Sequence, residues 1–120
     1  MAKNESLIVL RPRREASLRS DGMKGVLELL FFKDPSIARD ALAFANHVKE
    51  RQRSGDQYSV VEWQKYVKMS GITLSRYYSI VNKLKGTGIL RREHGNFVIS
   101  EDFPRLLNEV VQIYYAWRAV

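Results

Sequence analysis

The segment from Thr73 to Lys85 carries guanidinium, amide, hydroxyl and ammonium side chains that suit noncovalent recognition of DNA. Arg76 can donate paired hydrogen bonds to the edge of a guanine, and Asn82 can bind the edge of an adenine. Serine and lysine side chains can bind phosphate oxygens, which positions a protein without selecting a base sequence. The candidate contacts in this segment are Thr73, Ser75, Arg76, Tyr78, Ser79, Asn82, Lys83 and Lys85.

Three of these candidates also fit a structural explanation. Lys83 and Lys85 fall near the end of the expected helix, where cations complement the negative end of the helix dipole. Tyr78 flanks the apolar stripe of the same helix, so its ring can face either the core or the DNA. Both explanations stay open at this point.

A helix over 73–85 would position these side chains. Tyr77, Val81 and Leu84 recur at spacings that place them on one face. Thr73 can cap the helix through its hydroxyl oxygen, and Gly71 can adopt a positive φ in the turn before it. Glycines at 86 and 88 are expected to end the helix.

A β-hairpin is expected directly after this helix, over residues 89–99. Apolar pairs flank the sequence His94-Gly95-Asn96, which can form the turn. Side chains alternate along a strand, so Arg91 and Arg92 cannot both face one DNA groove. We expect one arginine to contact DNA and the other to pair with an acid. The hairpin candidates are Arg91, Arg92, His94 and Asn96, with a plain turn role as the alternative for His94.

The residues before Gly71 predict a short strand and a helix. Tyr58-Ser59-Val60 can pair with the hairpin, and Ser59 can also cap a helix running to about Met69, with Glu62 as its capping-box partner. Lys65 and Lys68 on that helix would face the phosphate backbone if the helix crosses it.

Residues 58–100 resemble the winged helix-turn-helix superfamily of DNA-binding proteins. The resemblance rests on the turn Gly71-Ile72-Thr73, on a buried framework and on a basic wing strand. Its framework residues are Tyr77, Val81, Leu84 and Gly88, and its wing arginines are Arg91 and Arg92. One departure is Val67, where the superfamily usually has a small residue, so the two helices are expected to pack slightly further apart. The resemblance implies a helix in the major groove and a wing on the backbone or the minor groove.

The chain of 120 residues carries a net charge of +7, and the position of that charge supports a polyanionic partner. Residues 73–99 hold five cations and only one acid, Glu93, whereas residues 21–56 hold equal numbers of each. Residues 1–20 are also basic. We expect an extended arm there, and Pro12 biases its neighbour away from helix. The arm either enters a minor groove or is an ordinary frayed terminus.

Two helices are expected between the arm and residue 58. Asp21 is a candidate N-cap for a densely apolar helix reaching Phe32, and Asp34 or Ser36 is a candidate cap for a second helix ending near Arg53. The first helix is apolar on nearly all sides, so it is expected to be buried in the core or between subunits.

A wide apolar stripe marks the last expected helix, at 102–118. Together with the helix before residue 33, it exceeds what one small domain needs to bury. We therefore expect a homodimer, and the alternative is a single intramolecular bundle. The candidate interface residues are Leu29, Phe32, Val110, Tyr114 and Trp117.

The composition and the absence of certain motifs exclude several classes of protein. The chain has no cysteine, no phosphate-binding glycine loop, no nucleophile elbow, no HExxH motif and no apolar run long enough to span a bilayer. We therefore expect no enzyme, metal, cofactor, membrane association or small-molecule ligand. We expect a mainly α protein with a β-hairpin, in which 21–120 form one winged helix-turn-helix domain.

The expected function is binding of double-stranded DNA as a dimeric transcriptional regulator, in the cytoplasm or on the nucleoid. One alternative is a sequence-tolerant architectural or replication-associated DNA-binding protein. Another is a winged-helix module for protein–protein contact, which would predict a neutral recognition helix instead of one with Arg76, Lys83 and Lys85.

Overall fold

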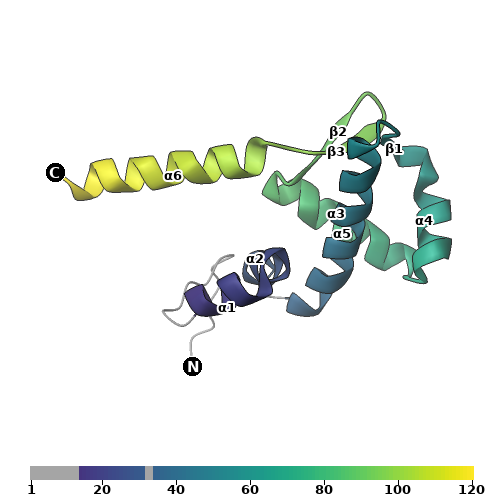
Figure 1. The fold of residues 1–120 in the computed structure, drawn as a ribbon, viewed down its shortest axis with the longest axis horizontal. Coiled ribbons are helices and arrows are strands. Elements are labelled where there is room, and N and C mark those ends of the chain that lie inside the picture. Colours follow the sequence, from purple (N-terminus) through teal and green to yellow (C-terminus); the bar gives the residue numbers. More distant parts are fainter. Residues whose placement is uncertain (1–13, 32–33) are drawn as a thin grey trace.

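The chain folds into helices and one small antiparallel sheet in the computed structural model, which describes residues 14–31 and 34–120 (Figure 1). The mainly α class with a small β component is confirmed. The elements in order are α1 (Arg14–Asp21), α2 (Met23–Leu30), a 3-10 turn (Pro35–Ile37), α3 (Ala38–Arg53), β1 (Tyr58–Ser59), a second 3-10 turn (Val60–Glu62), α4 (Trp63–Ser70), α5 (Leu74–Thr87), β2 (Leu90–Glu93), β3 (Asn96–Ile99) and α6 (Asp102–Arg118).

The sheet has the order β1-β3-β2, and both pairs are antiparallel. The hairpin turn holds His94 at φ 52° and Gly95 at φ 79°. Two consecutive positive φ values are what a two-residue turn of the favoured hairpin type requires. The short strand expected at Tyr58 is also confirmed, since Tyr58 lies opposite Phe97.

The capping residues expected around α5 are confirmed. Gly71 has φ 76°, and the Thr73 hydroxyl oxygen accepts a hydrogen bond from the Arg76 backbone N–H at 3.1 Å. The helix runs two residues past the expected end, with Gly86 inside it, and Gly88 ends it at φ 83°. A side chain at Gly88 would also crowd the next helix, since an added Cβ would lie 3.3 Å from the Phe103 nitrogen.

Phe44 on α3 lies at the centre of the core. Its ring packs edge-on against Tyr58, Tyr66, Tyr77 and Phe97, with ring centroids 5.0–6.2 Å apart. These partners come from β1, α4, α5 and β3. One buried aromatic side chain on α3 therefore joins β1, α4, α5 and β3.

A second contact links α3 to the start of α4. The Arg51 guanidinium donates to both carboxylate oxygens of Glu62, at 3.0 and 3.1 Å. Glu62 also accepts from the Ser59 backbone N–H, which completes the capping box expected from sequence. The Arg51 hydrogen bonds, followed by the Ser59 backbone hydrogen bond, lower the pKa of Glu62.

The structure corrects two expectations about the N-terminal third. Residues 14–21 form helix α1, where only an extended arm was expected; residues 1–13 lie outside the described part. A Cβ on Gly25 of α2 would lie 3.5 Å from both the Cα and Cδ2 atoms of Leu18, so α1 and α2 pack closely. Tertiary packing stabilises α1 without a periodic apolar pattern of its own. Asp21 ends α1, and Gly22 occupies the cap position of α2.

Neither Asp34 nor Ser36 caps α3. The Ser36 hydroxyl donates to the Asp34 carboxylate at 2.8 Å, and the 3-10 turn Pro35–Ile37 leads into the helix. Proline in the first turn presets the backbone angle and needs no hydrogen-bond acceptor, so the helix starts without a side-chain cap.

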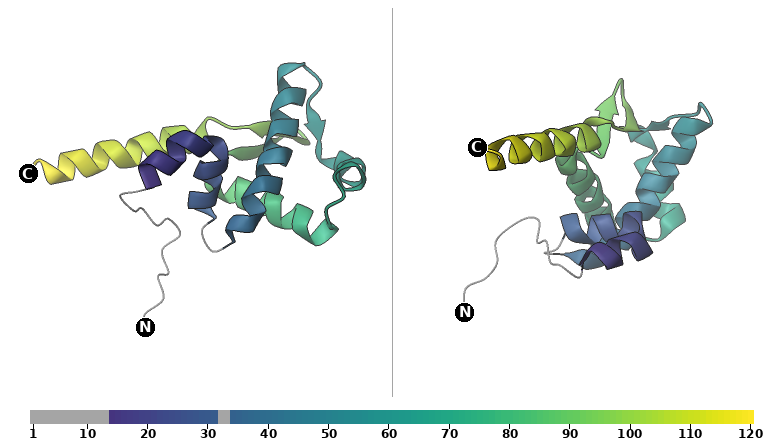
Figure 2. Two further views of the ribbon diagram at one scale, coloured as in Figure 1. Left: turned by 60° about the horizontal axis from the view of Figure 1, so that its bottom comes forward. Right: turned by 60° about the vertical axis from the view of Figure 1, so that its left-hand side comes forward.

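Helix α6 leaves the body and projects from it in the direction opposite to α4 (Figure 1). The two further views agree, and the right-hand view separates α6 clearly from α1 and α2 (Figure 2). Within the described residues, no helix is long and apolar enough to cross a membrane.

Replacing Phe44 with alanine is expected to lower the free energy of unfolding by about 3–5 kcal/mol, because its ring is fully buried among four others. The measurement is urea denaturation followed by circular dichroism. Val61→Ala is the control, since Val61 is 77% exposed and should change stability by no more than about 0.5 kcal/mol. A loss below about 1 kcal/mol for Phe44→Ala would contradict this account of the core.

Replacing Glu62 with glutamine is expected to cost about 1 kcal/mol at neutral pH, because the charged hydrogen bonds to Arg51 are weakened. A carboxyl whose pKa is lowered on folding stabilises the protein above its unfolded pKa, and this contribution is lost as the pH falls through the folded pKa. The stability difference between wild type and Glu62→Gln should therefore shrink at acid pH, below the usual glutamate pKa. Glu109→Gln, on the exposed part of α6, is the control. A difference that is constant with pH would disprove the role of the charge.

Candidate nucleic-acid interface

Helix α5 has one buried and one exposed side. Tyr77, Ile80 and Leu84 are at most 3% exposed and pack in the core. Ser75 and Asn82 lie on the opposite side and are exposed. The core therefore fixes which side chains α5 presents to solvent.

The outward face of α5 consists of residues 75, 79, 82 and 86, which follow the three- and four-residue spacing of one helix face. Within residues 14–31 and 34–120, no side-chain hydrogen bond or ion pair engages Ser75, Ser79 or Asn82. A Cβ at Gly86 would meet no atom within 4 Å, so packing inside the chain does not require this glycine. Glycine inside a helix costs stability relative to alanine. The side chains of this face are thus small and polar, and no described side chain binds them.

Arg76, a candidate for a guanine contact from the sequence, does not lie on this outward face. Its Nε atom lies 2.5 Å from an Asp40 carboxylate oxygen, and its guanidinium also donates to the Ser36 carbonyl at 3.0 Å. The physical reason is the packing of α5 on α3, which brings the carboxylate of Asp40 beside the arginine. Arg76 fixes α5 to α3, and a base contact would first have to break this pair.

The remaining candidates on α5 flank its outward face. Tyr78 is 50% exposed, and its ring packs against Tyr77, so it lies between core and surface as its position in the sequence indicated. Lys83 is half-buried and Lys85 is exposed. Thr73 is committed to capping.

The two hairpin arginines differ as strand alternation predicts. Arg91 donates to Glu93 at 2.7 Å and lies 3.7 Å from Asp102. The hydrogen bond to Glu93 raises the pKa of Arg91. Arg92 is exposed, and no ion pair engages it within the described part of the chain. Arg92 is therefore the hairpin cation available for a phosphate.

The other hairpin candidates serve the hairpin itself. His94 holds a positive φ in the turn. The Asn96 amide donates to the Gln57 side-chain oxygen at 3.0 Å, which ties β3 to the residue before β1. Only His94 keeps a fully exposed side chain at the turn.

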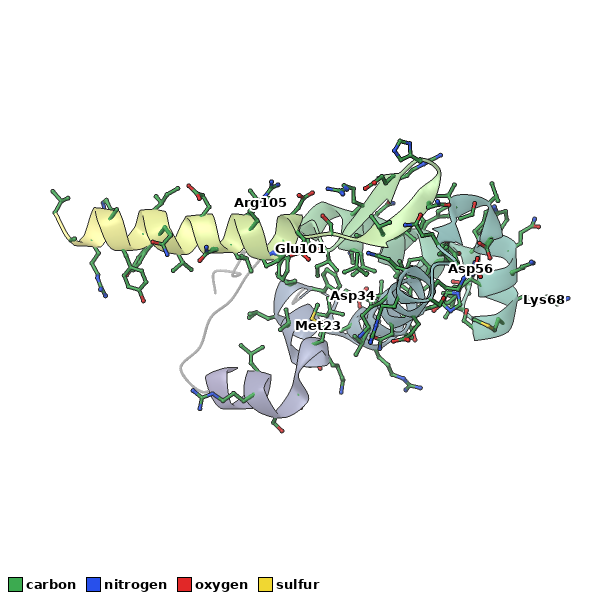
Figure 3. The ribbon with its side chains drawn as sticks, turned by 45° about the horizontal axis from the view of Figure 1, so that its top comes forward. Met23, Asp34, Asp56, Lys68, Glu101 and Arg105 are labelled. Atoms are coloured by element: carbon green, nitrogen blue, oxygen red, sulfur yellow. The ribbon has the colours of Figure 1, made fainter. Side chains whose placement is uncertain are left out.

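Helix α4 contributes Lys65 and Lys68, and both are exposed. Figure 3 shows Lys68 pointing outward at the end of the molecule opposite α6. Both lysines are carried by the helix that immediately precedes α5 in the chain.

The candidate interface residues on α6 are more exposed than the one described on α2. Val110, Tyr114 and Trp117 on α6 are 62%, 52% and 73% exposed. Leu29 on α2 is already half-buried within its own chain, and Phe32 lies outside the described residues.

In the described ranges, no group of three histidine, aspartate or glutamate side chains is placed to hold a metal ion. His47 packs beside the rings of Tyr58 and Tyr66. Its burial, and then the charge of Arg51, lower its pKa.

Asp40 is the residue of the site that the sequence alone did not reveal, because nothing in the sequence links it to Arg76, 36 residues later.

Comparison with known proteins gives one match. No curated protein matches the chain, and no solved structure matches it either. A family model described as an archaeal family matches residues 20–120, which is most of the chain and includes every described candidate contact. The chain therefore belongs to this archaeal family.

Proposed function

We propose that the protein binds double-stranded DNA, with the helix at 73–85 in the major groove and the hairpin at 89–99 on the backbone or in the minor groove. The observation that carries the proposal is the outward face of α5. It is polar and free of intramolecular side-chain hydrogen bonds within the described residues, while the opposite face is fixed in the core. An α-helix presented in this way fits the width of the major groove.

The order of elements supports a winged helix-turn-helix assignment. Helix α4, the tight turn at Gly71 and helix α5 are followed by the β2–β3 hairpin, and β1 pairs with that hairpin. This is the order that the sequence resemblance implies for residues 58–100. In such proteins the second helix supplies base contacts.

The available cations lie around the outward face and not on it. Lys85 flanks the face, Arg92 lies on the hairpin, and Lys65 and Lys68 lie on α4. In a duplex the phosphates border the groove and the base edges form its floor. We infer that these cations bind phosphate, while Ser75, Ser79 and Asn82 approach the bases.

Arg76 then acts as a positioning residue. Its pair with Asp40 holds α5 against α3, so the orientation of the outward face depends on it. The small side chains along that face, with Gly86 at its end, would let the helix backbone come close to the groove floor.

The proposed use is transcriptional regulation by a dimer, which would place the protein with the genome inside the cell. A sequence-tolerant architectural or replication role remains the alternative within DNA binding, and site selection separates the two. A protein-interaction module becomes the leading explanation if no DNA is bound.

Fluorescence anisotropy on a random-sequence duplex across a salt series tests DNA binding directly. Log affinity should fall linearly with log salt, with a slope between about −3 and −5 per protomer if the available cations each contact a phosphate. No binding even at low salt would overturn the proposal.

Arg92→Ala and Arg91→Ala form a matched pair in the same assay, since the residues are neighbours on β2 and each change removes one positive charge. Arg92→Ala should weaken binding to all sequences and reduce the salt slope by about 1. Arg91→Ala should leave the slope unchanged, because Arg91 is engaged by Glu93 and Asp102. Equal effects of both changes would contradict the assignment of Arg92 as a specific phosphate contact.

Asn82→Ala and Arg76→Ala separate base contact from positioning. On a selected site, Asn82→Ala should cost about 1–3 kcal/mol of binding and much less on random DNA. Arg76→Ala should weaken binding to both DNAs alike and lower the free energy of unfolding by about 1 kcal/mol, because a half-exposed ion pair is lost. A loss confined to the selected site for Arg76→Ala would restore it as a base contact.

A further inference from the structure

Helix α6 exposes an apolar surface that residues 14–31 and 34–101 do not cover. Every residue from 104 to 120 is exposed, including Leu106 at 56%, Ile113 at 62% and Trp117 at 73%. Helices in proteins owe most of their stability to packing of an apolar face. We therefore expect the exposed side of α6 to pack against a partner.

The apolar side chains of α6 form one stripe. They lie at residues 106, 107, 110, 113, 114 and 117, with Val111 and Tyr115 along one edge, while Arg105, Asn108, Glu109 and Gln112 occupy the opposite side. Phe103, one turn earlier, is half-buried and packs against the core of its own chain. The six residues of the stripe are 41–73% exposed, which leaves an apolar patch of roughly several hundred Å², the size that marks an interaction site.

The stripe is symmetric about Val110, the middle residue of Asp102–Arg118. A half-turn about this residue places Leu106 at the height of the partner's Tyr114, and Leu107 at the height of the partner's Ile113. A surface with this symmetry is complementary to itself, which is what a two-fold interface requires. We propose that α6 pairs antiparallel with α6 of a second copy, with the two-fold axis at Val110.

The antiparallel order also suits the helix dipoles, which then oppose each other favourably. In a parallel pair, the two dipoles would lie side by side with like ends together.

The size of the stripe is sufficient for a stable dimer. Covering such a patch on both copies would bury on the order of 1,000 Å² in total, which is about what a specific interface needs. A lipid surface is a poorer partner, because the polar side of α6 carries no excess of cations: Arg105 and Arg118 are balanced by Asp102 and Glu109.

The pairing deepens the dimeric part of the proposed function, but its test does not involve DNA. Sedimentation equilibrium should show a dimer for the wild-type chain at micromolar concentration. Val110→Asp should weaken association at least about 100-fold, because it places two like charges at the centre of an apolar interface. Asn108→Asp, on the opposite side of the helix, is the control and should associate as the wild type does. Val110 is 62% exposed, so the change should leave the fold intact, which circular dichroism verifies.

Helix direction is tested by disulfide formation, which is clean because the natural chain has no cysteine. Val110→Cys should cross-link to itself, whereas Trp117→Cys should not, since the antiparallel order separates the two copies of residue 117 by most of the length of the helix pair. Ready cross-linking of both variants would establish a parallel pair and overturn the proposal. A wild-type monomer, whether free or bound to neutral lipid vesicles, would overturn it as well. A dimer that binds no DNA would leave this pairing standing and refute the proposed function alone.

Discussion

The packing of α5 against α3 around Phe44 is the contact on which the rest of the structure depends. It joins β1, α4, α5 and β3 to one side chain and forces the polar side of α5 outward. The cluster is polar only at its hydroxyls, where Tyr58 and Tyr77 share a hydrogen bond of 3.0 Å. Burial raises the pKa of Tyr66 to about 12 and also raises the pKa of Tyr58 and Tyr77, so the tyrosines stay neutral. An uncharged, fully buried core can therefore hold α5 rigidly, which a recognition helix requires.

The sequence alone predicted the structural features that depend on residues only a few positions apart. The turn at Gly71, the cap at Thr73 and the capping box at Ser59 each depend on neighbours within four positions, and all three are present. The sequence alone did not predict the features that depend on tertiary contacts. Leu18 of α1 packs on α2, and no local apolar periodicity predicts this contact. The sequence alone also could not show that Asp40 would engage Arg76, because only the packing of α5 on α3 brings them together.

This engagement changes how the charge of the surface should be understood. Counting residues gives five cations over 73–99, but Arg76 and Arg91 are each held by acids of the same chain. What is left is a neutral polar stripe along α5 with cations beside it. A duplex has the complementary arrangement, with anionic phosphates on both sides of a groove whose floor is polar and uncharged. The distribution of the free cations is therefore a better argument for DNA than the net charge.

The start of α6 connects the two proposed surfaces. A Cβ on Gly88 would lie 3.3 Å from the Phe103 nitrogen and 3.5 Å from the Asp102 Cβ, so α6 begins in direct contact with the residue that ends α5. Arg91 reinforces this junction from the hairpin through its contact with Asp102. Because Gly88 has φ 83° and an added side chain there would crowd the start of α6, α6 begins close to the end of α5. Pairing of two α6 helices would therefore constrain the relative orientation of two α5 helices. That orientation determines the spacing of the DNA half-sites that a dimer can occupy.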